Sequence, residues 1–431
     1  MPKVLMLGWE FPPLYSGGLG IATYGMVKAM SQRAKIRLII PNATPTEDLV
    51  EVSIKGLNKI TSEEINLERL TYSLANTGAE VLQIPLRLSP YHHINQEISQ
   101  SGDEAYELLK MGKGTVSNLH SIFSSKEVYG SNILQKINLY AHLASQLAGD
   151  KDFDVIHAHD WITFPGGVKI KDDSGKPLVL HVHSLETDRS GEKCRNRIYK
   201  LEKDCLSVAD KIIAVSQYTK DQILQHYQID PSRISVVHNG IDPIQASRKE
   251  HVLKDKMVVF LGRLTHQKGP QFLIETAEKV ARVYPRVKFV VAGTGDQFAH
   301  ALETSAYKKL GSKFMFTGFL SKARVNELLS MADVYFMPSV SEPFGLSALE
   351  AAQFGVPSVI SKQSGAAEVM KSTLQADFWD TDKYANYIHA LLKYSALKSE
   401  LTAKAQSEIT GLTWDHAADK LLSIYSEIRN N

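Results

Sequence analysis

The residues best suited to chemistry are two carboxylates, Glu342 and Glu350, which lie eight positions apart in the segment Ser-Val-Ser-Glu-Pro-Phe-Gly-Leu-Ser-Ala-Leu-Glu-Ala. A strand-like run at 333–338 comes before them, and a helix is predicted to begin between them. A carboxylate at this position does not serve a phosphate, because like charges repel. It accepts hydrogen bonds from hydroxyl groups. We therefore interpret Glu342 as a ligand for sugar hydroxyls and Glu350 as a ligand for a second diol.

The start of that helix supplies a third part of the predicted site. Pro343 has a backbone angle suited to a first helical position, and Phe344, Gly345 and Leu346 follow it with N–H groups free to bind a ligand. Such N–H groups attract anions. One ligand with a phosphate and two polyol groups would use all three parts. A single Glu near a helix start is also explained by the helix dipole alone, so the other motifs must decide.

Two cations form the next chemical feature. Arg263 and Lys268 lie five positions apart in Gly-Arg-Leu-Thr-His-Gln-Lys-Gly, just after an apolar strand-like run. Breaking a sugar–diphosphate bond leaves negative charge on the leaving group, and fixed cationic donors stabilise that charge. We predict that the pair binds one diphosphate and takes the place of a metal ion. The alternative is a solvated basic loop, but the flanking Gly262 and Gly269 favour a phosphate-binding loop.

A glycine-rich turn follows the first strand-like run of the chain. In the segment Ser-Gly-Gly-Leu-Gly, Gly17 and Gly18 permit close approach of a phosphate to the backbone, and a helix is predicted over 21–30. A similar turn occurs in dinucleotide-binding domains, but the Gly-x-Gly-x-x-Gly spacing is missing. The turn is therefore a weak signal by itself and gains meaning from the other motifs.

Two more strand ends carry polar side chains. The run His-Ala-His-Asp-Trp at 157–161 is expected to direct Asp160 into a cleft, and the next strand ends close to His183. His157 and His159 alternate along the strand, which also allows a zinc site, but no carboxylate or Cys cluster lies nearby in the sequence. A lone His at a strand end is usually structural. Convergence of several strand ends favours a sugar-binding role for His183.

Composition excludes several classes of protein. The 431 residues are 43% hydrophobic and 22% charged, as in ordinary globular domains, and the formal net charge of +2 gives no case for nucleic acid as the main partner. Cys194 and Cys205 have neither disulfide-framework nor zinc spacing, so we expect a reducing, cytoplasmic setting. We expect no signal peptide and no integral membrane segment, and peripheral membrane contact stays open.

Short Val- and Ile-rich runs separated by helical stretches are typical of parallel sheets covered on both faces. In the first half these runs are 4–7, 36–40, 81–86, 155–158, 178–182 and 212–215, and in the second they are 258–261, 289–292, 314–317, 334–337 and 358–360. We predict an α/β protein with two doubly wound Rossmann-like domains and a cleft between the carboxyl edges of their sheets.

The predicted domain boundaries follow from this rhythm. Residues 1–245 form a first domain, the polar stretch 245–251 links it to a second domain at 253–412, and 413–431 form a terminal helix behind an N-cap Thr413. Within the first domain, 91–132 has mixed polar and helical sequence without a strong strand. We interpret it as an insertion near the acceptor side of the cleft.

Taken together, these motifs resemble those of retaining glycosyltransferases of family 4, which have the GT-B architecture. The match is best to bacterial glycogen synthases and maltose-1-phosphate synthases, and it covers nearly the whole chain. The shared segments are 16–20, 157–161, 183–189, 262–269 and 342–350. Two departures occur: Tyr15-Ser16 stands where relatives often have a Lys before the glycines, and Ser364-Gly365 replaces a pair of glycines near the donor sugar.

The resemblance implies roles for the remaining residues. Gly318, Phe319 and Leu320 would hold the nucleotide base, and Glu350 would hold the ribose. Glu342 and His183 would hold the transferred sugar, and Asp160 would lie near it. The terminal helix would cross back to the first domain, and no metal or other cofactor is implied.

The resulting expectation is transfer of a hexose, in particular glucose, from UDP-glucose or ADP-glucose to an acceptor hydroxyl with retention of configuration. Front-side displacement is expected, since no carboxylate in the motifs is placed as a covalent nucleophile. The acceptor stays open between a glucan, a small sugar or phosphosugar, and a lipid. Alternatives are a sugar-nucleotide epimerase, a phosphorylase, or a non-catalytic sugar-nucleotide-binding protein of the same fold.

Overall fold

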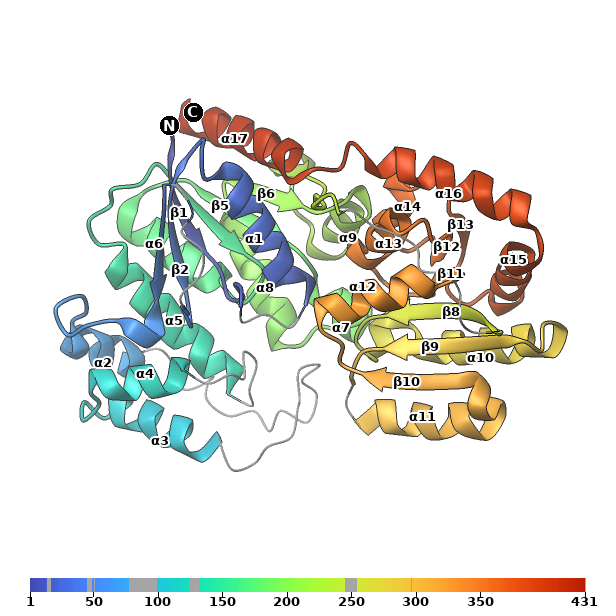
Figure 1. Ribbon diagram of the computed structural model, residues 1–431. Coiled ribbons are helices and arrows are strands. Elements are labelled where there is room, and N and C mark those ends of the chain that lie inside the picture. The colour runs from blue at the N-terminus through green and yellow to red at the C-terminus, as the bar shows by residue number, and fades with distance from the viewer. Residues whose placement is uncertain are drawn as a thin grey trace.

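The chain forms two parallel β-sheets with helices on both faces of each (Figure 1). This arrangement is seen in a computed structural model. The first sheet has the strand order β3-β2-β1-β4-β5-β6-β7, and the second has the order β10-β9-β8-β11-β12-β13. The structure describes residues 1–13, 17–44, 49, 51–76, 99–124, 132–244, 254–295 and 297–430.

The first sheet is built from short apolar strands whose central members are fully buried. Its strands are β1 (Lys3–Leu7), β2 (Lys35–Ile40), β3 (Val52–Gly56), β4 (Val155–His159), β5 (Leu178–Val182), β6 (Lys211–Ala214) and β7 (Ile234–Val236). β4 pairs with β5 so that His159 lies opposite His181, and β4 pairs with β1 on its other side. Because all the strands are parallel, their carboxyl ends meet along one edge.

Helices cover both faces of this sheet. The helices of this half are α1 (Gly18–Met30), α2 (Leu67–Asn76), α3 (Ser99–Lys110), α4 (Val116–Phe123), α5 (Ile133–Leu147), α6 (Phe164–Ser174), α7 (Glu186–Ser190), α8 (Arg197–Val208) and α9 (Gln217–Tyr227). One core contains residues of α5, α6 and α8, and a second core, on the opposite face, contains residues of α1. Each sheet face is thus shielded from water, as a parallel sheet requires.

The second sheet repeats this plan. Its strands are β8 (Lys256–Leu261), β9 (Val287–Ala292), β10 (Phe314–Gly318), β11 (Val334–Met337), β12 (Ser358–Ser361) and β13 (Leu374–Ala376). Its helices are α10 (Pro270–Val283), α11 (Gln297–Leu310), α12 (Lys322–Met331), α13 (Leu346–Gln353), α14 (Ala366–Val369), α15 (Thr381–Lys393) and α16 (Ser395–Ile409). Two cores lie on its two faces.

The last helix, α17 (Trp414–Asn430), leaves the second half and packs against α1 of the first (Figure 1). Thr413 caps it, since its hydroxyl oxygen accepts a hydrogen bond from the backbone N–H of His416 at 3.2 Å. Trp414 lies so close to Gly25 of α1 that a Cβ at Gly25 would be 2.3 Å from the indole ring. The two halves are therefore joined by a packed helix as well as by the chain.

The sequence predicted the central strands of both sheets, and those that the structure describes are confirmed. It missed the edge strands β3, β7 and β13, because an edge strand needs no continuous apolar run. The predicted strand at 81–86 and the linker at 245–251 lie outside the described residues, as does part of the 91–132 insertion. Within that insertion the structure has α3 and α4.

In the described part of the chain, no helix has the length and apolar character that crossing a membrane requires.

Candidate active site

The loop between β11 and α13 holds Glu342 in a fixed, buried position. The backbone N–H of Glu342 donates to the carbonyl oxygen of Gln363 at 2.9 Å, and its carbonyl oxygen accepts from the N–H of Gly365 at 2.9 Å. These two bonds tie the loop to the turn after β12. The side chain of Glu342 is almost fully buried, so its position is set by the protein before any ligand binds.

The helix after Glu342 begins later than the sequence predicted. α13 starts at Leu346, and Gly345 precedes it as N-cap with φ of +100°. Pro343 is therefore not a first helical position, and that prediction was wrong. The physical reason is the left-handed turn at Gly345, which only glycine adopts without strain and which resets the chain direction before the helix. The side chain of Phe344 is buried in the core, and the role of its backbone N–H stays a prediction.

Lys268 forms an ion pair with Glu342. It ends the short helix η4 (His266–Lys268), and Gly269 follows with φ of +64°. A Cβ at Gly269 would lie 2.2 Å from the carbonyl oxygen of Pro338, so only glycine fits there. The predicted anion-binding Lys and the predicted sugar-binding Glu are thus brought together. The positive charge of Lys268 also compensates the burial of the Glu342 carboxylate.

Arg263 lies in the same loop, half-buried, directly after β8. The N–H of the next residue, Leu264, donates to the carbonyl oxygen of Thr294 at 2.9 Å and fixes the loop to the end of β9. Arg263 and Lys268 therefore flank the same turn at the carboxyl edge of the second sheet. This is the edge where ligands of doubly wound sheets bind.

Glu350 lies on α13 and forms a second ion pair, with Lys322 at the start of α12. The sequence predicted Glu350 as a site residue but missed Lys322, which follows the turn at 316–320 by only two residues. The site thus contains two carboxylates, each paired with one lysine. Each carboxylate has lone pairs to offer a diol once its lysine moves aside.

A cavity of about 470 Å³ opens between the two halves beside this second ion pair. Its polar lining includes Glu350, Lys322 and Asp242, and its apolar lining includes Tyr24 and Trp414. This volume lies within the range of about 300–1,000 Å³ that is typical of small-molecule sites. The cavity therefore has room for a nucleoside-sized ligand with a diol-binding carboxylate at its wall.

The glycine turn after β1 faces this region from the first half. A Cβ at Gly18 would lie 3.7 Å from Cδ1 of Leu346, whereas a Cβ at Gly17 would meet none of the described residues within 4 Å. Gly18 and Leu346, both predicted site residues from opposite halves, are thus neighbours.

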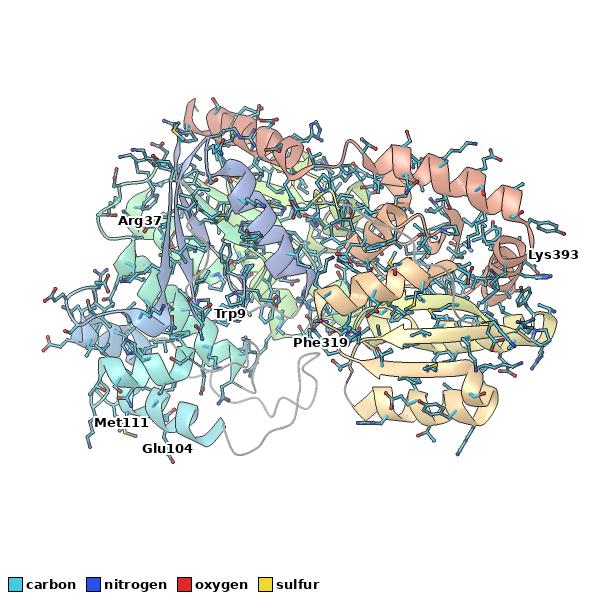
Figure 2. The ribbon with its side chains drawn as sticks, in the orientation of Figure 1. Trp9, Arg37, Glu104, Met111, Phe319 and Lys393 are labelled. Carbon is cyan, nitrogen blue, oxygen red and sulfur yellow. The ribbon has the colours of Figure 1, made fainter. Side chains whose placement is uncertain are left out.

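The predicted base-binding turn lies at the end of β10. Gly318 has φ of +71°, and its carbonyl oxygen accepts from the N–H of Gly293 at 2.9 Å. Phe319 is 71% exposed and lies on the side of the second half that faces the first (Figure 2). Leu320 packs on the core. None of the three residues lines the 470 Å³ cavity, whereas Lys322, which follows the turn, does. The turn is therefore next to the cavity but does not form its wall.

Asp160 follows β4 in a left-handed backbone conformation, with φ of +64°. Its carboxylate accepts hydrogen bonds from the backbone N–H groups of His183 and Ser184, at 3.3 and 3.2 Å. Burial raises the pKa of Asp160 to about 6, although Arg189 and these N–H groups act in the opposite direction. The unusual backbone angle and shifted pKa are frequent at functional sites.

Four histidines stack beneath this strand end. They are His157 and His159 on β4, and His181 and His183 at the end of β5, with ring centroids 4.3 to 5.3 Å apart. His157 Nε2 lies 3.2 Å from His181 Nδ1, and His159 Nδ1 lies 3.0 Å from His183 Nε2. Tyr425 of α17 hydrogen-bonds to His157 Nδ1. The stack therefore connects the terminal helix with His183.

Nitrogen ligand atoms of His157, His159 and His181 lie within 4.8 Å of one another, close enough to raise the question of a metal ion. However, the rings of His157 and His181 are inclined by only 7°, and those of His159 and His181 by 22°. Nε2 of His157 and Nδ1 of His181 are instead engaged with each other in an imidazole–imidazole hydrogen bond at 3.2 Å. Burial lowers the pKa of His157 and of His183 to about 3. We therefore describe the cluster as a stack of neutral imidazoles.

Glu368 on α14 makes contacts with the first half that the sequence did not reveal. Its carboxylate accepts a hydrogen bond from the backbone N–H of Gln217 at 2.8 Å and contacts His238 Nε2 at 2.8 Å. Both partners belong to the first half. The partnership spans more than 120 residues, so no local motif could have indicated it.

Comparison with known proteins agrees with this architecture. The family model described as "Glycosyl transferases group 1" matches residues 243–408, and the model described as "Glycosyltransferase Family 4" matches residues 99–245. Alpha-maltose-1-phosphate synthase of Mycolicibacterium smegmatis is 30% identical over 312 residues, covering 64% of this chain and 79% of that protein. Glycogen synthase of Mycobacterium tuberculosis is 26% identical over 382 residues, covering 85% and 80%.

Solved structures of the same fold cover almost the entire chain. Sucrose-phosphate synthase from Thermosynechococcus elongatus superposes with a TM-score of 0.70 at 16% identity, over 99% of both chains. Anabaena HepE in complex with UDP-glucose superposes with a TM-score of 0.66 at 17% identity, over 99% of this chain and 100% of that one. With two parallel sheets facing each other and both family models matched in tandem, the chain belongs to glycosyltransferase family 4 and is a retaining, nucleotide-sugar-dependent hexosyltransferase of the GT-B fold.

Proposed function

We propose that this enzyme transfers glucose from UDP-glucose or ADP-glucose to an acceptor hydroxyl. The observation that carries the proposal is the pair of lysine-bound carboxylates at the edge of the second sheet, Glu342 with Lys268 and Glu350 with Lys322. A nucleotide sugar has a hexose, a diphosphate and a ribose in this order. Hydroxyls of the hexose and ribose suit the two carboxylates, and the diphosphate suits the cations between them.

The cavity supports placement of the nucleoside half. It lies beside Glu350 and is lined largely by apolar residues of both halves. We propose that the ribose hydroxyls replace Lys322 as the hydrogen-bond partner of Glu350, while the base lies toward Gly318, Phe319 and Leu320. The exposed ring of Phe319 offers a face on which a base can stack.

The transfer step follows from this arrangement. The acceptor oxygen attacks the anomeric carbon of the hexose on the same face from which the diphosphate leaves, so configuration is retained. The carbon–oxygen bond to the diphosphate breaks, and its electron pair remains on the phosphate oxygen, which takes the proton of the acceptor hydroxyl. Arg263 and Lys268 stabilise the negative charge that develops there. Glu342 holds the hexose hydroxyls throughout.

His183 and Asp160 approach the hexose from the first half. Because its pKa is about 3, His183 is neutral at pH 7 and offers a hydrogen bond to a hydroxyl without adding charge. Asp160 fixes the backbone of His183 and Ser184 and thus the position of that imidazole. We propose that these residues orient the hexose, and that no metal ion is needed, since the two cations supply the charge.

The relatives favour a glucose donor and leave the acceptor class open. One is described as an alpha-maltose-1-phosphate synthase and another as a glycogen synthase, and a protein of the same fold was solved with UDP-glucose. We propose a glucan as the acceptor, ahead of a small sugar or phosphosugar. Location in the cytoplasm is part of the same proposal.

The test is release of nucleoside diphosphate from UDP-glucose, ADP-glucose and GDP-mannose, each with glycogen, glucose 1-phosphate, glucose 6-phosphate or no acceptor. We expect acceptor-dependent release from one glucose donor, unchanged by EDTA. Release that requires Mg²⁺ or Mn²⁺ after chelation would contradict the metal-free step. Saturable donor binding without release under any condition would favour an epimerase or a sugar-nucleotide-binding protein.

A further inference from the structure

Both neighbours of Glu342 in the sequence are held by side chains from the opposite half. Ser341, before Glu342, donates its hydroxyl proton to Oδ1 of Asp188 at 2.5 Å. Tyr218 lies with its hydroxyl oxygen 2.9 Å from the Ser341 oxygen. Since the Ser341 proton points to Asp188, the Tyr218 hydroxyl is the donor in this second bond. The three groups form one directed chain across the boundary between the halves.

Asp188 is also held by a contact within its own half. It lies on the short helix α7 and is almost fully buried, and its Oδ2 accepts from the backbone N–H of Leu185 at 2.7 Å. α7 packs against η4, the element that ends at Lys268. With one carboxylate oxygen taken by Leu185, the other is left for Ser341, so the contact has little freedom.

The other neighbour of Glu342 is held in a similar way. Ser216 donates its hydroxyl proton to the carbonyl oxygen of Pro343 at 2.5 Å, while its oxygen caps α9 by accepting from the N–H of Thr219 at 2.9 Å. Ser216 thus belongs to the framework of the first half. The loop of Glu342 is therefore fastened on both sides of the carboxylate to groups outside its own half.

The same loop is coupled to Lys268. The backbone N–H groups of Val340 and Ser341 both donate to the carbonyl oxygen of Gln267, at 2.9 and 3.3 Å. Gln267 immediately precedes Lys268 on η4. A displacement of Ser341 would therefore also displace Glu342, the next residue, and, through Gln267, Lys268.

We propose that Asp188 is a positioning residue, which acts through Ser341 to orient Glu342 and Lys268 for transfer. This inference rests on the proposed function, because it assigns Asp188 and Ser341 to that same reaction. Neither residue contacts the donor in this scheme. Their effect is to keep the reacting groups aligned, and misplacement of about 1 Å is enough to slow an enzymatic step by about 100-fold.

The experiment compares Ser341→Ala with Ser341→Thr in the full-length protein. Alanine removes the hydroxyl, whereas threonine keeps it and adds one methyl group. The control is Ser145→Ala, because Ser145 is as buried as Ser341 and also donates a hydrogen bond to a carboxylate, that of Asp173. That bond joins α5 to the end of α6, far along the chain from the Glu342 loop. The readouts are kcat and KM for UDP-glucose or ADP-glucose turnover, and binding of UDP or ADP by calorimetry.

We expect Ser341→Ala to lower kcat by at least about 10-fold, with donor KM and nucleotide affinity within about 3-fold of wild type. Ser341→Thr should keep kcat within about 3-fold of wild type, as should Ser145→Ala. Asp188→Asn should also lower kcat, because one amide cannot accept from both Leu185 and Ser341. The double variant Asp188→Asn, Ser341→Ala should lose no more than the more impaired single variant, since both act through one bond.

Equal kcat in Ser341→Ala and Ser145→Ala would overturn the inference while leaving the proposed function intact. An equal loss of kcat in Ser341→Ala and Ser341→Thr, together with an equal drop in thermal stability, would show that Ser341 has only a packing role. That result would also overturn the inference. Absence of turnover in the wild type with every donor and acceptor would instead refute the proposed function, and with it this inference.

Discussion

At the level of single residues, Lys268 takes part in both tasks of the proposed site, because it contacts the sugar-binding carboxylate Glu342 and is assigned to the diphosphate. It forms an ion pair with Glu342, and in the proposed reaction it turns to the diphosphate. The ion pair therefore supplies an opposite charge to a carboxylate that is almost fully buried. Lys322 has the same relation to Glu350. Ligand binding on this account is an exchange of partners, in which diols and phosphates replace the lysine–carboxylate contacts.

Replacing Lys268 by Ala should lower kcat/KM by about 100- to 1,000-fold, as loss of a single oxyanion donor does in other enzymes. The reason is lost stabilisation of the departing diphosphate and an uncompensated Glu342. Steady-state kinetics with the best donor measures this effect. Lys279→Ala is the matched control, since Lys279 forms an ion pair with Asp382 on the surface of the same half. Unchanged kcat/KM in Lys268→Ala would remove its assigned role.

The site residues differ in how far the sequence could predict them. Arg263, Lys268, Glu342 and Glu350 lie within short segments whose types and spacing already indicate a diphosphate and two diols. Their partners do not follow from local pattern. Lys322 is 28 residues from Glu350, and Lys268 is 74 residues from Glu342. These pairings depend on how loops and helices of the second half pack together, and the contact of Ser341 with Asp188, 153 residues away, depends on how the two halves meet.

The histidine stack makes β4 and β5 a source of pH-dependent stability. Alternation along each strand puts His157, His159, His181 and His183 on one face, and burial keeps them neutral. The sequence showed two histidines at alternate positions on each strand end. It did not show that the two pairs stack, because that depends on the register that places His159 opposite His181.

Acidification should therefore destabilise the protein. The four imidazoles have folded-state pKa values below the unfolded value of about 6.5, so the stability they contribute is fully present above that pH and is lost as pH falls toward about 3. Asp160, Asp188 and Glu202 act in the opposite sense, since burial raises their pKa, to about 6 for Asp160 and about 7 for Glu202. The four imidazoles outnumber these three carboxyl groups, and burial also lowers the pKa of His142 and His226. We therefore expect a lower urea midpoint at pH 5 than at pH 7.

The control for this prediction is His300→Ala, because His300 is 83% exposed and should leave the pH dependence unchanged. His181→Phe removes one buried imidazole and should reduce the slope of stability against pH by about 1.4 kcal/mol per pH unit, the value for one proton. A pH dependence that is the same in His181→Phe and His300→Ala would show that the stack does not titrate as described.

The edge strands show why the element prediction was incomplete. The central strands were predicted because burial on both faces demands Val and Ile at nearly every position. β7 and β13 have three residues each and lie at sheet edges, where a polar residue is tolerated. The start of α13 was missed for another reason: Gly345 has a left-handed conformation, and Pro343, two residues earlier, does not indicate it.

At the level of the whole molecule, α17 joins the two halves. It follows α16 of the second half, yet its apolar face packs on α1, and Arg33 forms ion pairs with Asp415 and Asp419. Domain boundaries at 1–245, 253–412 and 413–431 stay a prediction. The geometry that brings Gly18 near Leu346 depends on how the halves are held, and α17 is one of the elements that hold them.

Trp414→Ala should lower the free energy of unfolding of the first half by about 3–5 kcal/mol, the usual effect of truncating a buried Trp. Trp414 packs against Gly25 and also lines the cavity between the halves. Urea denaturation followed by circular dichroism measures the change. Trp379→Ala is the control, because Trp379 is 59% exposed in the second half and should change stability little. Equal effects of the two substitutions would contradict the described role of α17.

The most direct test of the central claim is the effect of Glu342→Gln on acceptor-dependent release of UDP or ADP from the donor that wild type uses. The substitution keeps the shape of the side chain but removes the charge that pairs with Lys268 and the second acceptor oxygen for a sugar diol. We predict a loss of kcat/KM of at least about 100-fold, with the fold intact by circular dichroism. A kcat/KM within about 3-fold of wild type would show that the reaction does not depend on this carboxylate and would contradict the account.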